Sequence, residues 1–233
     1  MSTAIMAYRR VTGEGAHGTH GDQGAHTPTL TAPGDAMNTL GTPPAAGARH
    51  TEPLDVHLMA LRDGPRGTEV LLSRQAGAVY AAGMWHLPSG HLDGPHEDVV
   101  TALVREAREE TGLVVAPGDV RAALTVHHRG PTGRARVGFF FEVRRWRGTP
   151  SVREPEVCDG MDWFPLDAPP DPVVAYCRAG LRAYAAGARI AVHFQEPGDP
   201  VAHDPGFDRL RLVPERAPLG PGGRVEPPGA GRA

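Results

Sequence analysis

The chain has 233 residues, a formal net charge of −3 and 24 basic residues, all of which are arginine. The acidic balance and the lack of a basic run argue against a nucleic-acid surface as the main partner. The absence of lysine excludes Schiff-base chemistry, and no apolar run has the length that crosses a bilayer. The two cysteines, Cys158 and Cys177, have neither metal-type nor disulfide-type spacing. We therefore expect a soluble, reduced, cytoplasmic protein.

Composition divides the chain into three parts. Residues 1–50 are rich in Gly, Ala, Thr, His and Pro and show no sustained apolar period, which predicts a disordered N-terminal tail. Residues 52–195 alternate between strand-like and helix-like patterns and form the predicted domain. Residues 196–233 are again rich in Pro and Gly, and we expect an extended or disordered C-terminal tail.

The predicted domain begins with a hairpin. Residues 54–61 alternate as a strand does, with Leu54, Val56, Leu58 and Ala60 on one face. An Asp-Gly-Pro-Arg-Gly turn follows at 63–67, and residues 70–74 form a second short apolar run. These features predict two antiparallel strands joined by a tight turn.

A helix is predicted next, between Asp98 as its N-cap and Gly112 as its left-handed stop. Its core-facing stripe has the spacing i, i+3, i+4, i+7 and consists of Val100, Leu103, Val104 and Ala107.

Three carboxylates, Glu106, Glu109 and Glu110, project from another face of this helix. Like charges that converge repel one another, so a purely structural helix gains nothing from this arrangement. A hard divalent cation reverses the argument, because Mg²⁺ prefers oxygen ligands and is often held by a few carboxylates plus substrate phosphates. Glu97 and Arg105 lie along a neighbouring row of the helix.

The second half of the domain continues the alternation. The residues predict strands at 120–126, 136–146 and 161–166, then an edge strand at 190–194. Phe139 and Phe141 should share one face of the long strand, and Phe140 should occupy the other. A second helix is predicted from Asp171-Pro172, as N-cap and first position, to about residue 185. Its inward residues would be Val174, Cys177, Leu181 and Tyr184.

The string from Gly90 to Leu113 resembles the Nudix box, Gly-x5-Glu-x7-Arg-Glu-U-x-Glu-Glu-x-Gly-U with U a bulky aliphatic residue. The matching residues are Glu97, Arg105, Glu106, Glu109, Glu110, Gly112 and Leu113. Two departures occur. Six residues separate Gly90 from Glu97 where the pattern has five, so the glycine loop is longer, and Ala107 replaces a larger aliphatic residue. The first departure affects loop geometry, and the second affects packing.

The resemblance implies an α/β fold, a Nudix-type α/β/α sandwich with a mixed sheet over residues 52–195. It also implies hydrolysis of a nucleoside diphosphate linked to another moiety, with Mg²⁺, or Mn²⁺ as the alternative, as cofactor. Carried over residue by residue, Glu106, Glu109 and Glu110 would be metal ligands, together with a backbone carbonyl at Ser89 or Gly90. Within the catalytic group Glu97, Arg105, Glu106 and Glu109, the first two would support the ligands.

Members of this family often take a further carboxylate from a later loop. Glu154-Pro155-Glu156 lies in the corresponding region, and we expect Glu156 to be a metal ligand or general base. A helix glutamate as the base, with both loop acids ordinary surface residues, is the alternative.

The substrate-binding residues expected from their positions are Arg74, to contact phosphate, and Trp85, to stack on a base or line the cleft. A core tryptophan and an ordinary exposed arginine are the alternatives. The expected partner is a nucleotide or another nucleoside-diphosphate-linked small molecule, with a weak preference for triphosphate-type substrates. No membrane partner is expected, and the sequence does not determine the oligomeric state. A non-catalytic Nudix-fold sensor or regulator is the alternative function.

Overall fold

The computed structural model describes residues 50–65, 67–78 and 80–215. From Glu52 onward the described residues belong to one compact unit. The tail predicted over residues 1–50 lies almost wholly outside the described residues, as does the end of the chain from residue 216.

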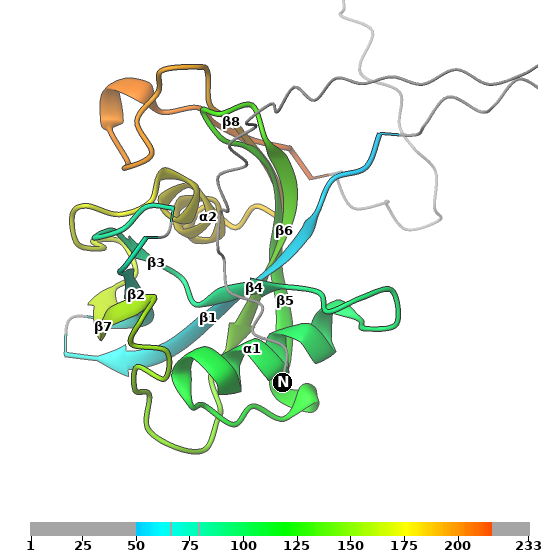
Figure 1. Ribbon diagram of the computed structural model, residues 1–233, viewed down its shortest axis with the longest axis vertical. Coiled ribbons are helices and arrows are strands. Elements are labelled where there is room, and N and C mark those ends of the chain that lie inside the picture. Colours follow the sequence, from blue (N-terminus) through cyan, green and yellow to red (C-terminus); the bar gives the residue numbers. More distant parts are fainter. Residues whose placement is uncertain (1–49, 66, 79, 216–233) are drawn as a thin grey trace, which may run out of the picture. The chain divides into compact units, whose positions relative to one another are not determined.

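The described elements are mostly strands, with α1 after the first group of strands and α2 near the end of the domain (Figure 1). In chain order they are β1 (Leu54–Gly64), β2 (Gly67–Gln75), β3 (Trp85–His86), β4 (Ser89–His91), α1 (Val99–Thr111), the 3-10 turn η1 (Pro117–Asp119), β5 (Val120–Arg129), β6 (Ala135–Val143), β7 (Cys158–Pro165), α2 (Ala175–Ala185), β8 (Ile190–Phe194), the 3-10 turn η2 (Pro205–Phe207) and β9 (Leu210–Leu212).

The strands form a mixed sheet in the order β3-β2-β1-β6-β5-β8-β9, with β4 paired to β1 and β7 paired to β2. β1 runs parallel to β6 and antiparallel to β2, and β5 runs parallel to β8. The predicted hairpin is confirmed, since β1 and β2 pair with Gly64 opposite Gly67 across the turn. The expected α/β fold with a mixed sheet is thereby confirmed.

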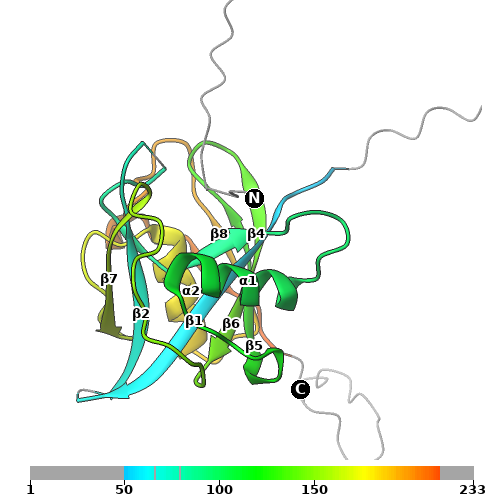
Figure 2. The same cartoon turned by 60° about the horizontal axis from the view of Figure 1, so that its bottom comes forward.

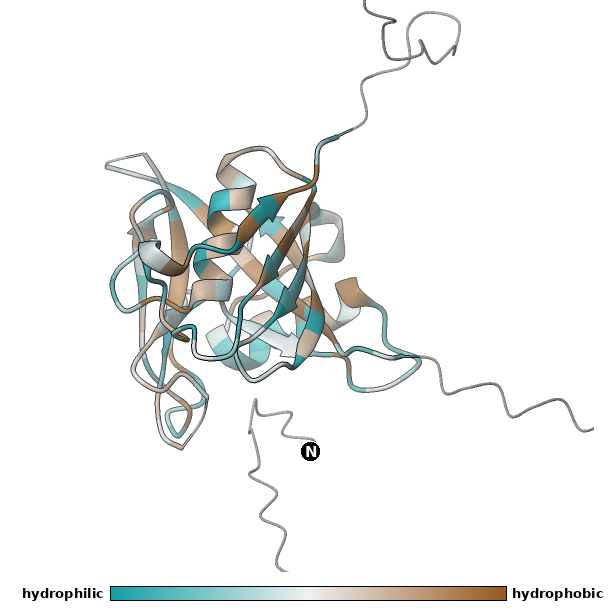
Figure 3. Cartoon of the chain, turned by 90° about the horizontal axis from the view of Figure 1, so that it is seen from above, coloured by the Kyte–Doolittle hydropathy of each residue, from teal (hydrophilic) through white to brown (hydrophobic). Residues whose placement is uncertain are grey.

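β1 is buried on both faces because a helix covers each side of it (Figures 1 and 2). Val56, Leu58 and Ala60 pack with α1, whereas Met59 and Leu61 belong to the core that contains α2 residues. The same separation holds in β6. Phe141 packs with the α1 core and Phe140 with the α2 core, as the alternation predicted. Apolar positions therefore run along the strands between the two helices (Figure 3).

The predicted start of the second helix was wrong. α2 begins at Ala175 with Val174 as its N-cap, and Asp171-Pro172 is a cis-linked dipeptide at a bend before it. The physical reason lies in long-range pairing. The Trp85 amide donates to the Pro172 carbonyl, and the Val174 amide donates to the Trp85 carbonyl, which holds residues 172–174 beside β3.

The end of the domain also differs from the prediction. The strand expected at an edge, β8, lies between β5 and β9. Residues 196–212, expected to be extended or disordered, contain η2 and β9, and β9 pairs antiparallel with β8. β6 ends at Val143, three residues before the predicted end, because Arg147 instead pairs with Val114 after α1.

Candidate functional site

The site is built on α1, whose two ends are fixed as the sequence predicted. The Asp98 side chain accepts hydrogen bonds from the Val100 and Thr101 amides at 2.8 and 3.0 Å. At the other end Gly112 adopts a left-handed conformation, with φ of 73°, and its amide donates to the Arg108 carbonyl. Both caps satisfy groups that the helix leaves unpaired. The caps fix the ends of α1, and packing of Leu103 and Ala107 into the core turns the glutamates toward β4.

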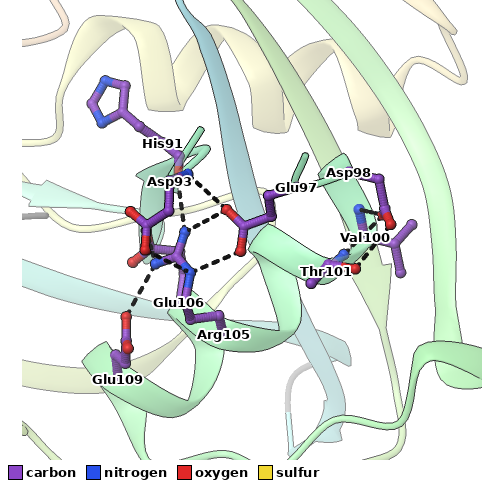
Figure 4. A network of polar contacts seen from close by, with 9 residues as sticks. All are labelled: His91, Asp93, Glu97, Asp98, Val100, Thr101, Arg105, Glu106 and Glu109. Carbon is purple, nitrogen blue, oxygen red and sulfur yellow. Dashed lines mark hydrogen bonds and ion pairs between the residues drawn. The ribbon is translucent and has the colours of Figure 1, made fainter. Parts of the chain in front are cut away.

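Arg105 of α1 contacts both the glycine loop and the glutamates of the helix (Figure 4). Its Nε donates to Glu97 Oε1 at 2.9 Å, and its Nη1 donates to Glu106 at 2.8 Å and to Glu109 at 3.1 Å. Its Nη2 donates to the His91 carbonyl at 2.8 Å. Hydrogen bonding to Arg105 lowers the pKa of Glu97, which stays ionised. Arg105 thus links the glycine loop to the helix carboxylates.

The carboxylate of Glu106 lies against the backbone of β4. A Cβ placed on Gly90 would lie 2.0 Å from both Cδ and Oε1 of Glu106, so only glycine permits this approach. The Glu106 side chain is 7% exposed. Burial raises the pKa of Glu106 to about 7, although Arg105 opposes that rise.

Glu110 faces the same strand one residue earlier. Its Oε2 accepts a hydrogen bond from the Ser89 amide at 2.9 Å. Burial, followed by the negative charge of Glu106, raises the pKa of Glu110 well above its ordinary value. Glu109 is the most exposed of the three helix glutamates, with a side chain 48% exposed. The three predicted carboxylates are therefore brought together, two of them partly desolvated.

The longer glycine loop closes onto the same network. The amide of Asp93 donates to Glu97 Oε2 at 2.7 Å, and the Asp93 carboxylate lies 3.5 Å from Arg105 Nε. Glu97 therefore accepts from both the loop and α1. The additional residue is accommodated without loss of the contact between Glu97 and Arg105.

The donor set suits a hard divalent cation. Carboxylate oxygens crowd together at Glu106, Glu109 and Glu110, and the cost of that crowding falls when a cation neutralises it. Within the part of the chain that the structure describes, no three His, Cys, Asp or Glu side chains stand in metal-holding geometry. The guanidinium of Arg105 lies between Glu106 and Glu109 and binds both. Cation binding would require Glu109, the exposed member, to turn.

The loop between β6 and β7 brings a further acid toward these carboxylates. One end of the loop is fixed to the end of α1, where the Ser151 amide donates to the Thr111 carbonyl at 3.0 Å. The other end is fixed to the end of β2, where the Ala76 amide donates to the Val157 carbonyl at 2.8 Å. Glu154 lies between the two anchors, so its position depends on both elements.

Glu154 rather than Glu156 is coupled to the helix carboxylates. Glu154 is partly buried, and its pKa is raised by burial and by the charges of Glu156 and Glu109. Its charge in turn contributes to the raised pKa of Glu110. Glu156 is exposed, and its carbonyl lies against Gly77, where a Cβ would approach it to 2.4 Å.

Arg74 and Trp85 are brought together on adjacent strands. They pair in register between β2 and β3, and the Arg74 guanidinium lies 5.8 Å from the centre of the Trp85 ring. Arg74 Nε also donates to Asp159 at 2.7 Å. Trp85 is partly buried and packs edge-on against Phe164, with ring centroids 4.7 Å apart. Trp85 therefore packs partly against the core, and Arg74 is a partly exposed arginine that pairs with Asp159.

Two backbone contacts of the site could not be predicted from the sequence. The Ser89 amide donates to Glu110, and the His91 carbonyl accepts from Arg105. Almost every residue type has these backbone groups, so the residue types at 89 and 91 do not indicate the contacts. The Asp93 contact was missed because it depends on how the longer loop closes. Among the described helices, none is both long and apolar enough to cross a lipid bilayer.

Comparison with known proteins agrees with this geometry. The NUDIX domain family matches residues 53–180. The human 8-oxo-dGDP phosphatase NUDT18 is 34% identical over 110 residues, which are 46% of this chain and 32% of that protein. Its mouse counterpart is 30% identical over the same share of each chain. The matched region thus spans about a third of the length of these curated relatives.

A solved structure supports the same assignment. The MutT NUDIX hydrolase from Burkholderia pseudomallei is 28% identical, with a TM-score of 0.51, and the match covers 57% of this chain and 98% of that one. The family match covers more than half of the chain and contains the whole network around Arg105. The chain belongs to the NUDIX domain family.

Proposed function

We propose that this chain is a Mg²⁺-dependent hydrolase, with Mn²⁺ as an alternative metal, that cleaves a phosphoanhydride bond in a nucleoside diphosphate derivative. The main support is the burial of two neighbouring glutamates of α1. Glu106 lies against Gly90, and Glu110 accepts from the Ser89 amide. The pKa values of both are raised, and ionising them together is costly unless a cation binds beside them. Family membership makes hydrolysis the reaction that this cation would serve.

Each residue has a defined task in this proposal. A divalent cation held here would neutralise charge on the diphosphate and activate water as the nucleophile. Glu106, Glu109 and Glu110 would hold it, with a carbonyl of β4 at Ser89 or Gly90 as a further ligand. Arg105, bound to Glu97, keeps Glu106 oriented and would release Glu109 to the cation.

We propose Glu154, in place of Glu156, as the general base whose carboxylate accepts a proton from the attacking water. Support comes from its partial burial and its electrostatic coupling to Glu109 and Glu110. The oxygen–phosphorus bond forms as the phosphoanhydride bond breaks, and the leaving phosphate takes the electron pair. A diphosphate then yields a monophosphate and phosphate, whereas a triphosphate yields a monophosphate and pyrophosphate.

The relatives suggest a substrate class. NUDT18 is named an 8-oxo-dGDP phosphatase, so we propose a purine deoxynucleoside diphosphate with an oxidised base as the first substrate to test. In this proposal Trp85 contacts the base, and the guanidinium of Arg74, which lies 5.8 Å from the Trp85 ring centre, contacts a phosphate. This choice replaces the triphosphate preference suggested by the sequence.

The test is a nucleotide panel at fixed Mg²⁺, in which phosphate and pyrophosphate release are measured separately. The panel pairs 8-oxo-dGDP with dGDP and 8-oxo-dGTP with dGTP, so that base and phosphate preferences are read independently. We expect turnover that EDTA abolishes, fastest with 8-oxo-dGDP. Fast turnover of triphosphates alone would overturn the substrate class but leave the hydrolase proposal intact.

The second candidate function is a Nudix-fold sensor. The retained set of Glu97, Glu106, Glu109 and Glu110 argues against it, because a sensor has no need of a metal-ligand face. Calorimetric titration with the same nucleotides, compared with the turnover assay, distinguishes a hydrolase from a sensor. Tight binding without metal-dependent turnover by the wild-type chain would support the sensor.

A further inference from the structure

Residues 196–212 lie outside the NUDIX match and form a defined segment, which we call the C-terminal strap. It begins with a turn in which the Asp199 amide donates to the Glu196 carbonyl and the Glu196 amide donates back to Asp199 Oδ2. η2 and β9 follow, and β9 pairs with β8. In Figure 1 the strap is the orange segment beside α2 and β8.

The middle of the strap pairs with the chain just before α2. The His203 amide donates to the Val173 carbonyl at 2.7 Å, and the Ala175 amide donates to the Val201 carbonyl at 2.9 Å. Val174 and Ala202 form an antiparallel bridge between these bonds. The strap thus adds a strand-like partner to residues 173–175.

The same stretch pairs on its other side with β3. The Trp85 amide donates to the Pro172 carbonyl at 2.8 Å, and the Val174 amide donates to the Trp85 carbonyl at 2.9 Å. Trp85 in turn pairs with Arg74 of β2. A continuous ladder of backbone hydrogen bonds therefore runs from the strap, through 172–174, to Trp85.

The residues after Trp85 lead directly into the carboxylate site. The Leu58 amide donates to the Pro88 carbonyl at 2.9 Å, and the next residue, Ser89, donates its amide to Glu110. Residues 85–90 are therefore held at one end by β1 and α1 and at the other by the ladder from the strap. In that ladder residues 172–174 belong to the family match, and the strap that backs them lies outside it.

One ion pair closes the strap on itself. Asp199, whose side chain is 4% exposed, accepts from Arg209 Nε at 3.0 Å and from Arg209 Nη2 at 3.2 Å. This two-pronged contact joins the two ends of the stretch that carries Val201 and His203. Arg182 of α2 pairs with Asp208 and ties the same end of the strap to the helix.

We propose that the C-terminal strap is a positioning element of the active site, and that the Asp199–Arg209 pair fixes Trp85 through the ladder at 172–174. Loosening the pair lets β3 move relative to β4 and weakens substrate binding at the Trp85 side of the cleft. The part of this inference that concerns substrate rests on the proposed function. The part that concerns Trp85 does not.

The test compares Arg209→Ala with Arg211→Ala, which removes the same charge from an exposed position in β9 of the same strap. Amide hydrogen exchange is followed at Trp85 and Val174, with the Ala102 amide of α1 as the internal reference. Arg209→Ala should speed exchange at Trp85 and Val174 by roughly tenfold and leave Ala102 unchanged, because the loss is local. Arg211→Ala should change none of them.

Kinetics give the second readout. Arg209→Ala should raise KM for the best substrate of the panel severalfold and leave kcat within about twofold, since α1 and its carboxylates are untouched. Equal loss of exchange protection at all three amides, or unchanged protection at Trp85, would overturn the proposal. If Arg209→Ala does not fold, Asp199→Asn, which keeps the side-chain volume, is measured in the same way.

The exchange experiment needs no substrate. Local loss of protection without any turnover by the wild-type chain would therefore reject the proposed function and retain the strap. Full turnover by the wild type with no local effect of Arg209→Ala would do the opposite.

Discussion

Gly90 of β4 lies against the carboxylate of Glu106 of α1, so closely that a Cβ at Gly90 would fall 2.0 Å from Glu106 Cδ. The glycine of the loop and the first carboxylate of the helix are therefore one structural unit. Any side chain at position 90 would displace the Glu106 carboxylate.

The first prediction tests this contact. Gly90→Ala should push the Glu106 carboxylate out of place, lower the free energy of unfolding by about 1–3 kcal/mol and reduce turnover strongly. Urea denaturation and the Mg²⁺-dependent assay measure the two effects. Gly118→Ala is the matched control, because a Cβ there meets nothing within 4 Å. Equal effects of the two variants would contradict the account.

Arg105 should prove irreplaceable by lysine. Arg105→Lys keeps the charge but cannot donate to Glu97, Glu106, Glu109 and the His91 carbonyl together. We expect a drop in turnover of about 10–100-fold, as is typical when the partner of a metal ligand is lost. Arg108→Lys, on the exposed side of the same helix, should retain wild-type turnover. Similar kinetics for both variants would show that Arg105 does not orient the ligands.

Of the two glutamates in the β6–β7 loop, we expect Glu154 but not Glu156 to be needed for turnover. Glu154→Gln should lower kcat by at least about tenfold and flatten the acid limb of the pH–rate profile, because Glu154 would accept the proton. Glu156→Gln should leave kcat within about twofold, since its side chain is exposed. A larger loss in Glu156→Gln would restore the expectation derived from the sequence.

Buried histidines should make the fold sensitive to acid. Burial, reinforced by the charge of His193, lowers the pKa of His128 to about 3, and burial lowers the pKa of His193 to about 4. The unfolded chain therefore takes up protons first as the pH falls below about 6.5, and stability is lost between there and about pH 3. For His128 alone the full loss is up to about 5 kcal/mol.

Glu106 has the opposite effect, because its pKa is raised to about 7 and its protonation stabilises the fold as the pH falls. The contribution of His128 is therefore measured as a difference between wild type and a His128 variant. Urea unfolding of wild type and His128→Gln is compared at pH 7.5 and pH 4.5 in the absence of divalent metal. The wild type should lose more stability than the variant over this interval. His96→Gln, at an exposed position, should behave like the wild type.

The local elements were predictable because their signals are local. Asp98 and Gly112 mark the ends of α1 within a few residues of themselves, and the Gly64–Gly67 turn fixes the first hairpin. The facing of Glu106, Glu109 and Glu110 follows from helical spacing alone. These features need no knowledge of the rest of the chain.

The remaining features depend on contacts between distant segments. Asp171-Pro172 has the residues of a helix start, yet pairing with Trp85 keeps that stretch out of the helix. Glu154 and Glu156 are two residues apart in sequence, and only the anchors at Ser151 and Val157 decide which one approaches α1. The strap was missed because its short strand has a weak apolar pattern and acquires its shape by pairing with β8.

In our proposal the carboxylate face of α1 serves metal-dependent hydrolysis and is not needed to stabilise the fold. Glu109→Gln separates these two roles, because this side chain is 48% exposed and its loss should not unfold the domain. We predict that Mg²⁺-dependent turnover of the best nucleotide falls at least about 100-fold while the melting temperature stays within about 2 °C of wild type. Unchanged turnover, or a loss of turnover matched by a comparable loss of stability, would contradict the account.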